Sequence, residues 1–149
     1  MTVVRMSCVA VAAVLLLGGC GESEKALTSA KRTVADQANP ICEETLKKVG
    51  DLGGDAAAER DAVQSAADRL KAIPVPGDDE PTYRVFQVQV QNLALNLEDV
   101  HQNRLRAGSD PSAAAQVDKA LERARKSNEE LRKAAAKYGL VECSQGLTE

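Results

Sequence analysis

Apolar side chains recur at alternating spacings of four and three residues in two long segments near the end of the chain. The first segment carries Phe86, Val90, Leu93, Leu97 and Val100. The second carries Val117, Leu121, Ala124, Asn128, Leu131, Ala135 and Tyr138, with asparagine as its one polar member. This heptad spacing places the side chains along one face of an α-helix. Both segments are therefore predicted to be long helices that bury this face.

The stretch 86-FQVQVQ-91 also alternates between apolar and polar residues, as a half-buried strand does, and its valines favour a strand. The alternation changes phase at Asn92, whereas the heptad spacing continues to Val100. Because the heptad pattern is the longer of the two, it favours a helix here.

Capping residues, prolines and glycines predict where the helices begin and end. Asn39 followed by Pro40 is typical of a helix start, since Asn caps well and Pro suits the first helical position. The stretch 74-PVPGDDEP-81 is typical of a turn. The other predicted boundaries are glycines 50, 53 and 54 for the end of the first helix, Asp55 for the start of the second, Glu80 and Gly108 for the third, and Asp110, Pro111 and Gly139 for the fourth.

Four amphipathic helices with short links predict an all-α fold, an antiparallel four-helix bundle. The last two helices reach about 40 Å at 1.5 Å per residue and are longer than the first two. We therefore expect a long C-terminal hairpin whose tip, residues 106–111, overhangs the rest. The bundle domain is expected to span 39–149. Residues 20–38 are expected to form a membrane-proximal spacer, whose apolar positions at helical spacing leave a helix open as the alternative.

Residues 1–19 have the composition of a secretory signal: Arg5 near the start, an apolar run from Cys8 to Leu17, and small residues after it. The run is shorter than the roughly 20 apolar residues that a membrane span needs. Its end, Leu17-Gly18-Gly19-Cys20, resembles the lipobox of bacterial lipoproteins, and the alanine-rich composition is similar to that of small lipoproteins of high-GC Gram-positive bacteria. The resemblance implies cleavage before Cys20, a diacylglycerol on its thiol, and attachment to the outer face of the cell membrane. The alternative is an ordinary signal peptide that happens to end near a cysteine.

The chain has four cysteines, and an exported location determines how they are interpreted. Cys8 would leave with the signal, and Cys20 would carry the lipid. Cys42 and Cys143 remain, and two thiols in an oxidising compartment predict one disulfide. A metal pair or two free thiols are the alternatives, although a metal needs more ligands and the chain has one histidine. The predicted topology also permits the bridge, because the start of the first helix and the end of the fourth lie at the same end of the bundle.

Three polar groups in the predicted helices are candidate sites. Glu98-x-x-His101 matches half of a di-iron motif of helical bundles, but one chain supplies only one of the two histidines that the site needs. A dimer could supply the second, and a surface role is the alternative that we favour. The acidic run Asp78–Glu80 lacks the alternate spacing of a calcium loop and better suits a helix start. Asn128 lies in the heptad stripe, where a buried asparagine can fix helix register, or at an exposed edge.

Composition excludes some functions and leaves others open. Without residues 1–19 the chain has 18 basic and 22 acidic side chains, which argues against nucleic acid as a partner. Residues 111–138 carry seven basic and four acidic side chains, for which a solvated face is favoured over contact with anionic lipid or wall polymer. We find no nucleophile and base pair, no phosphate loop and no metal motif, so we expect no enzyme and no cofactor.

We therefore expect a membrane-anchored interaction module outside the cytoplasm, with an envelope protein as the possible partner. The alternative is a carrier or sensor that holds a small apolar ligand between its helices. Cavity volume separates the two hypotheses, because ligand pockets measure about 300–1,000 Å³.

Overall fold

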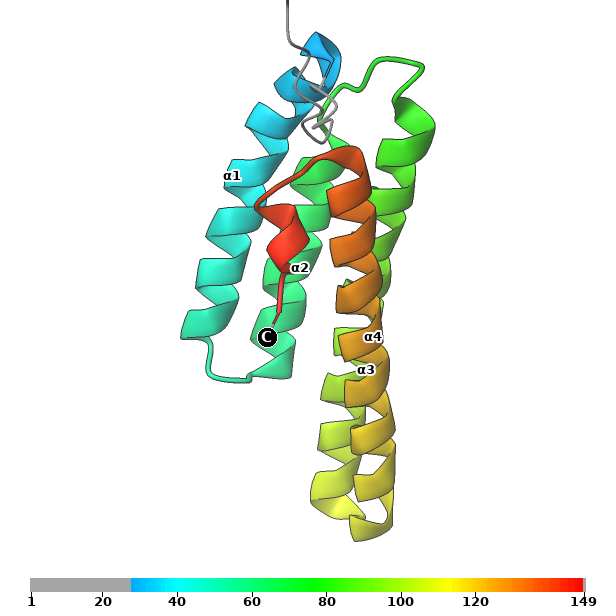
Figure 1. Ribbon diagram of the computed structural model, residues 1–149. Coiled ribbons are helices and arrows are strands. Elements are labelled where there is room, and N and C mark those ends of the chain that lie inside the picture. Colours follow the sequence, from blue (N-terminus) through cyan, green and yellow to red (C-terminus); the bar gives the residue numbers. More distant parts are fainter. Residues whose placement is uncertain (1–27, 149) are drawn as a thin grey trace, which may run out of the picture.

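The computed structural model describes residues 28–148, and the prediction of an all-α antiparallel bundle is confirmed. Its elements are α1 (Ser29–Asp51), α2 (Ala56–Lys71), α3 (Glu80–Ser109), the 3-10 turn η1 (Pro111–Ala113), α4 (Ala114–Tyr138) and the 3-10 turn η2 (Cys143–Gln145). Figure 1 shows the hairpin of α3 and α4 continuing well past the turn that joins α1 to α2, as predicted.

The first helix differs from the prediction, because it begins at Ser29 and continues through Pro40. Asn39 is therefore not a helix cap. Thr28 caps the helix instead, accepting a hydrogen bond from the backbone N–H of Lys31. Part of the expected spacer thus belongs to the bundle, where Val34, Ala35 and Ala38 are buried.

A proline inside a helix removes the bond to the carbonyl four residues earlier and normally costs about 3 kcal/mol. Here Pro40 and Asp36, whose carbonyl loses its donor, both lie on the exposed face of α1, where water can hydrate that carbonyl. Burial of the apolar side chains before Pro40 offsets the remaining cost.

Most of the other predicted helix boundaries are confirmed within a residue or two. The Asp55 carboxylate caps α2 by accepting from the backbone N–H groups of Ala57 and Ala58, and Asp110 caps η1 by accepting from Ser112. Gly139 ends α4 in the left-handed conformation, with φ of 99°. Asp79 precedes α3 but makes no side-chain capping bond, and its carboxylate lies 3.5 Å from Nζ of Lys31.

The core is built from small and medium apolar side chains, with a cluster of three aromatic rings near the start of α3 and the end of α4. The ring of Tyr83 lies 5.6 Å from that of Phe86 and 5.2 Å from that of Tyr138, centroid to centroid. The Tyr83 hydroxyl donates to the carbonyl of Leu70, which ties α3 to the end of α2. The Tyr138 hydroxyl is buried without a hydrogen-bond partner among residues 28–148, so ring packing stabilises this side of the cluster and polar pairing does not.

The fourth side of the bundle is closed by the C-terminal segment, residues 140–148. After Gly139 the chain turns back and runs between α1 and α4, as Figure 1 shows in red. Leu140, Cys143 and Leu147 of this segment are fully buried. α1 therefore packs against α2 and the C-terminal segment, and the C-terminal segment in turn packs against α4.

Candidate functional site

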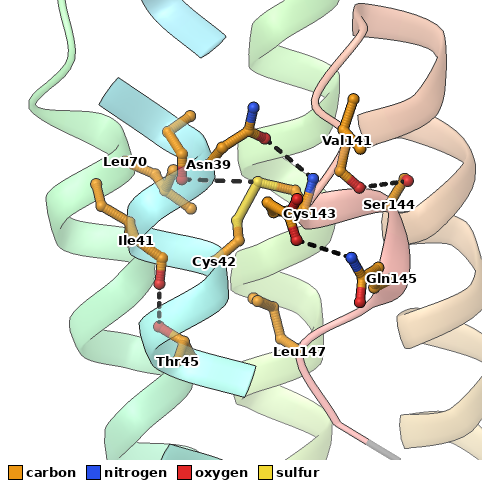
Figure 2. Close-up of a disulfide and its surroundings, with 12 residues drawn as sticks. Asn39, Ile41, Cys42, Thr45, Leu70, Val141, Cys143, Ser144, Gln145 and Leu147 are labelled. Atoms are coloured by element: carbon orange, nitrogen blue, oxygen red, sulfur yellow. Dashed lines mark hydrogen bonds between the residues drawn. A yellow bond between two sulfur atoms is a disulfide. The ribbon is translucent and has the colours of Figure 1, made fainter. Parts of the chain in front are cut away.

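The predicted disulfide between Cys42 and Cys143 is present and joins the middle of α1 to the C-terminal segment. Figure 2 shows the contacts around it. The side-chain oxygen of Asn39 accepts a hydrogen bond from the backbone N–H of Glu142 at 3.2 Å, so the residue predicted as a helix cap instead holds the C-terminal segment. Both sulfurs are buried. The bridge is therefore a structural link and offers no exposed thiol for chemistry.

Asn128 holds the other end of the C-terminal segment. Its side-chain oxygen accepts from the backbone N–H of Leu147 at 3.0 Å, and its amide nitrogen donates to the carbonyl of Thr148 at 2.6 Å. Only 8% of the residue is exposed. The sequence left open whether Asn128 is buried or lies at an exposed edge, and it is buried. Its side chain fixes the C-terminal segment against α4 and does not set the register between two helices.

Three of the five exposed large apolar side chains in the described part of the chain lie on the outer face of α3. Val85, Val88 and Leu95 are 53%, 49% and 58% exposed, and Asn92 lies between them, half-buried. Their spacing of three, four and three residues places them on one side of the helix, away from the buried stripe that begins at Phe86. We call these four residues the α3 outer stripe. The sequence contains this spacing, but the stripe that begins at Phe86 has more apolar members and gives the clearer helical pattern.

Two shallow grooves flank the upper half of the α3 outer stripe. One, of about 540 Å³, lies between α3 and the end of α2, with Ala67, Ile73 and Val75 on its far wall. The other, of about 530 Å³, is lined mostly by apolar atoms and includes Pro81, Val85 and Val88. Val88 lines both grooves, as Glu80 and Arg84 also do, and its side chain is 49% exposed. Projecting side chains with adjacent grooves form the surface that helices use to pack against one another.

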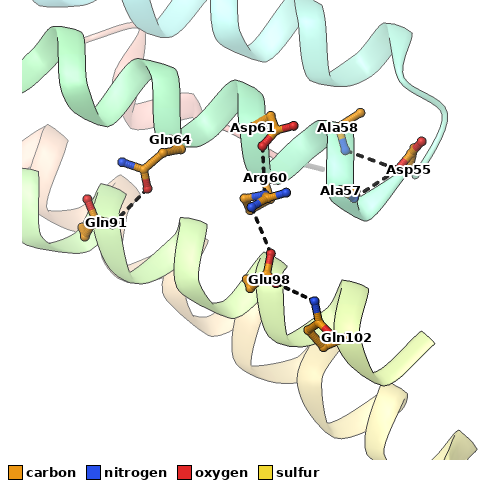
Figure 3. A network of polar contacts seen from close by, with 9 residues as sticks. All are labelled: Asp55, Ala57, Ala58, Arg60, Asp61, Gln64, Gln91, Glu98 and Gln102. Atoms are coloured by element: carbon orange, nitrogen blue, oxygen red, sulfur yellow. Dashed lines mark hydrogen bonds and ion pairs between the residues drawn. The ribbon is translucent and has the colours of Figure 1, made fainter. Parts of the chain in front are cut away.

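Polar side chains of α2 and α3 pair across the two helices, as Figure 3 shows. Glu98 lies 3.2 Å from the Arg60 guanidinium, and its other oxygen accepts from Gln102. Gln91 donates to Gln64 across the same two helices. The carboxylate of the Glu98-x-x-His101 motif is thus already engaged by an arginine, which does not suit a metal ligand. Within residues 28–148 no cluster of three or more metal-binding side chains exists.

A cleft of about 290 Å³ lies where the shorter hairpin ends against α3 and α4. Its floor is apolar and includes Leu97, Val100 and Leu121. At its rim, Arg104 donates to the carbonyl of Gly54 at 2.6 Å. Glu59 also lines the cleft, where partial burial raises the pKa of its carboxyl and the positive charge of Arg104 opposes that rise. We call this the hairpin cleft. It falls just below the usual size of a ligand pocket.

The remaining sequence predictions concern the N-terminus and the basic residues of α4. Leu17, Gly18, Gly19 and Cys20 lie outside the described residues. No helix within residues 28–148 combines the length and the apolar character that crossing a bilayer requires. Some basic side chains of α4 have partners within the protein: Arg123 contacts Asp99, Lys133 contacts Glu130, and Arg132 donates to the carbonyl of Ser144. These contacts are consistent with a solvated face whose basic side chains pair with α3, with α4 itself and with the C-terminal segment.

Comparison of the chain with protein-family models, with curated protein sequences and with solved structures found no match. The interpretation of function therefore rests on the residues and their geometry.

Proposed function

We propose that this protein is a non-catalytic interaction module, anchored by lipid to the outer face of the cell membrane, and that the α3 outer stripe is its binding surface. The observation that carries the proposal is the exposure of Val85, Val88 and Leu95 on one helix face. Exposed apolar side chains gathered in a patch, in contrast to scattered ones, are typical of interaction sites. The two grooves beside the patch can receive side chains of a partner helix.

Two features support the extracytoplasmic location. Leu17-Gly18-Gly19-Cys20 resembles a lipobox, and two acyl chains on one residue hold a protein stably at a membrane. The disulfide between Cys42 and Cys143 is typical of an oxidising compartment. Thr28, which caps α1, lies only eight residues after Cys20, so an anchor on Cys20 would keep the bundle near the bilayer.

Mass spectrometry of the mature protein, extracted from its own membrane, tests the anchor. We expect an N-terminal Cys20 that carries a diacylglycerol and resists denaturation. The matched variant Cys20→Ser should leave the membrane fraction and keep its helical circular dichroism. A mature protein that begins at another residue, without lipid, would contradict the proposed anchor.

Site-specific photo-crosslinking tests the binding surface. A photoreactive residue at position 88 is compared with one at Ser65, which is exposed on α2 and lies outside both grooves. In intact cells we expect discrete crosslinked species from position 88, and few or none from position 65. Equal labelling at both positions, or none at position 88, would argue against the α3 outer stripe as a binding surface.

The hairpin cleft supports a second candidate function, the binding of a small ligand with an apolar part. Its apolar floor would cover such a part, and Arg104 at its rim suits an anionic group. At about 290 Å³ the cleft is too small for a whole lipid chain with its headgroup. Native mass spectrometry of the full chain tests this function, with Leu121→Trp to fill the cleft. Mass that the parent chain loses on denaturation, and that the variant lacks, would support it. No such mass would count against it.

A further inference from the structure

The α3 outer stripe has a spacing that reads the same in both directions along the helix. The intervals between Val85, Val88, Asn92 and Leu95 are three, four and three residues. A helix that runs antiparallel to α3 and carries the same stripe therefore meets it position by position. A twofold-symmetric contact requires this self-complementarity, because each residue must face its symmetry partner's counterpart. This inference rests on the proposed function, since it names the partner of the same surface.

We propose that the α3 outer stripe binds a second copy of this chain, with the two α3 helices antiparallel. In this register Val85 packs against Leu95 of the second copy, and Val88 packs against Asn92 of the second copy. Gln91 meets its own counterpart beside the twofold axis, where two amides can hydrogen-bond to each other. The Val88 side chain fits beside α3 of the second copy, and the flanking grooves receive the neighbouring side chains.

Charge complementarity favours the antiparallel orientation over the parallel one. Arg84 stands just before the stripe and Glu98 just after it, both on the edge that faces α2, and their side chains are 70% and 35% exposed. An antiparallel pair brings Arg84 of each copy toward Glu98 of the other, at both ends of the contact. The Arg84–Glu80 and Glu98–Arg60 ion pairs then join into larger networks. A parallel pair instead places Arg84 opposite the neutral Gln89, so both charge pairings are lost.

The contact is small, so the dimer should be weak in solution. Residues 84–98 span only about 21 Å of helix, whereas stable interfaces bury on the order of 1,000 Å² or more. Asn92 at a seam position weakens the contact further, as polar residues do in coiled coils. Anchoring on one membrane raises the local concentration and offsets this weakness. Because both anchors must reach the same bilayer, the twofold axis stands normal to the membrane and the α3 helices lie along its surface.

Disulfide crosslinking in membranes of cells that express the full chain tests both partner and orientation. Val85→Cys and Leu95→Cys chains, carrying different tags, are co-expressed and oxidised briefly. The proposal predicts a mixed 85–95 dimer and little 85–85 dimer, because the two copies of position 85 lie about 15 Å apart along the helix. The parent chain and Ser65→Cys are the controls. A dominant 85–85 dimer would overturn the antiparallel register. The absence of any dimer at either position would overturn the second copy as partner.

Two further variants change the strength of association without relying on new cysteines. Val88→Asp should abolish the dimer, and its melting temperature serves as the check on folding. Asn92→Leu should raise the association constant about tenfold or more, since it replaces a polar seam residue on both copies by an apolar one. Position 88 could instead crosslink to another protein while neither cysteine pairing gives a dimer. That result would support the proposed binding surface and refute only the second copy as its partner.

Discussion

Replacement of Gly146 by alanine should destabilise the protein strongly, although the residue lies three positions from the end of the chain. Gly146 adopts φ of 96° and ψ of 178°, a region that side-chain-bearing residues rarely occupy. A Cβ built there would lie 2.8 Å from the amide nitrogen and 2.9 Å from the amide oxygen of Asn128. The same two atoms hold Leu147 and Thr148. The added methyl therefore strains the backbone and displaces the side chain that fixes the C-terminal segment.

The size of the effect follows from these two contributions. A backbone held in a glycine-only region costs about 1–3 kcal/mol. Displacement of the Asn128 amide removes two hydrogen bonds of about 0.5–1.5 kcal/mol each. We expect Gly146→Ala to lower the free energy of unfolding by roughly 2–6 kcal/mol. For a chain of this size each kcal/mol shifts the melting temperature by about 4 °C, so the midpoint should fall by roughly 8–24 °C.

Thermal and urea unfolding, followed by helical circular dichroism with the disulfide intact, measures this loss. Gly54→Ala is the matched control, because Gly54 has a φ of 86° but open space where its Cβ would lie. In an Asn128→Ala background, Gly146→Ala should cost only the backbone contribution, because no Asn128 amide remains to be displaced. If Gly146→Ala costs no more than Gly54→Ala, or costs the same with and without Asn128, the described contact does not hold the C-terminal segment.

Three further predictions concern stability. Cys42→Ser should lower the free energy of unfolding by up to about 4–5 kcal/mol, the value for a closed loop of about 100 residues, and a melting shift of only a few degrees would contradict this. Burial raises the pKa of Tyr138 to about 12 and that of Tyr83 above its ordinary value of 10.0. The unfolded chain therefore ionises first, and stability that is fully present below pH 10 should be lost as the pH rises toward 12. An ultraviolet titration should show both phenols ionising late, and ordinary midpoints would refute their burial. Asp55→Ala should cost about 1 kcal/mol in urea unfolding because it removes two capping bonds, whereas Asp79→Ala should cost clearly less.

The helix boundaries show which capping and turn residues were sufficient to predict where a helix begins or ends. Asp55, Asp110 and Gly139 act on groups within a few residues, so a cap or a left-handed turn can be recognised from the sequence alone. Asn39 followed by Pro40 gave an equally clear local signal and was wrong. There, burial of Val34, Ala35 and Ala38 against other elements outweighed the local preference of proline. The cost of a proline on an exposed helix face is fixed by its neighbours in the chain, but the gain from burial is not.

The candidate binding surface could be found only in part from the sequence. The three-four-three spacing of the α3 outer stripe can be read from the amino-acid sequence, but α3 carries a second apolar stripe with the same helical period. Periodicity identifies both stripes and does not say which one is buried. The packing of α2 and α4 against the stripe of Phe86 decided that question, and it left the other stripe exposed.

The sequence by itself determined the helices and the pairing of Cys42 with Cys143. These conclusions depend on periodicity, on capping within one turn, and on the small number of cysteines. Only the tertiary structure decided the course of residues 140–148, the role of Asn128 and the exposure of the α3 outer stripe. The contacts that settle them join residues from 19 to more than 100 positions apart. Such contacts form only when several buried surfaces meet at once, so no single segment of the chain encodes them.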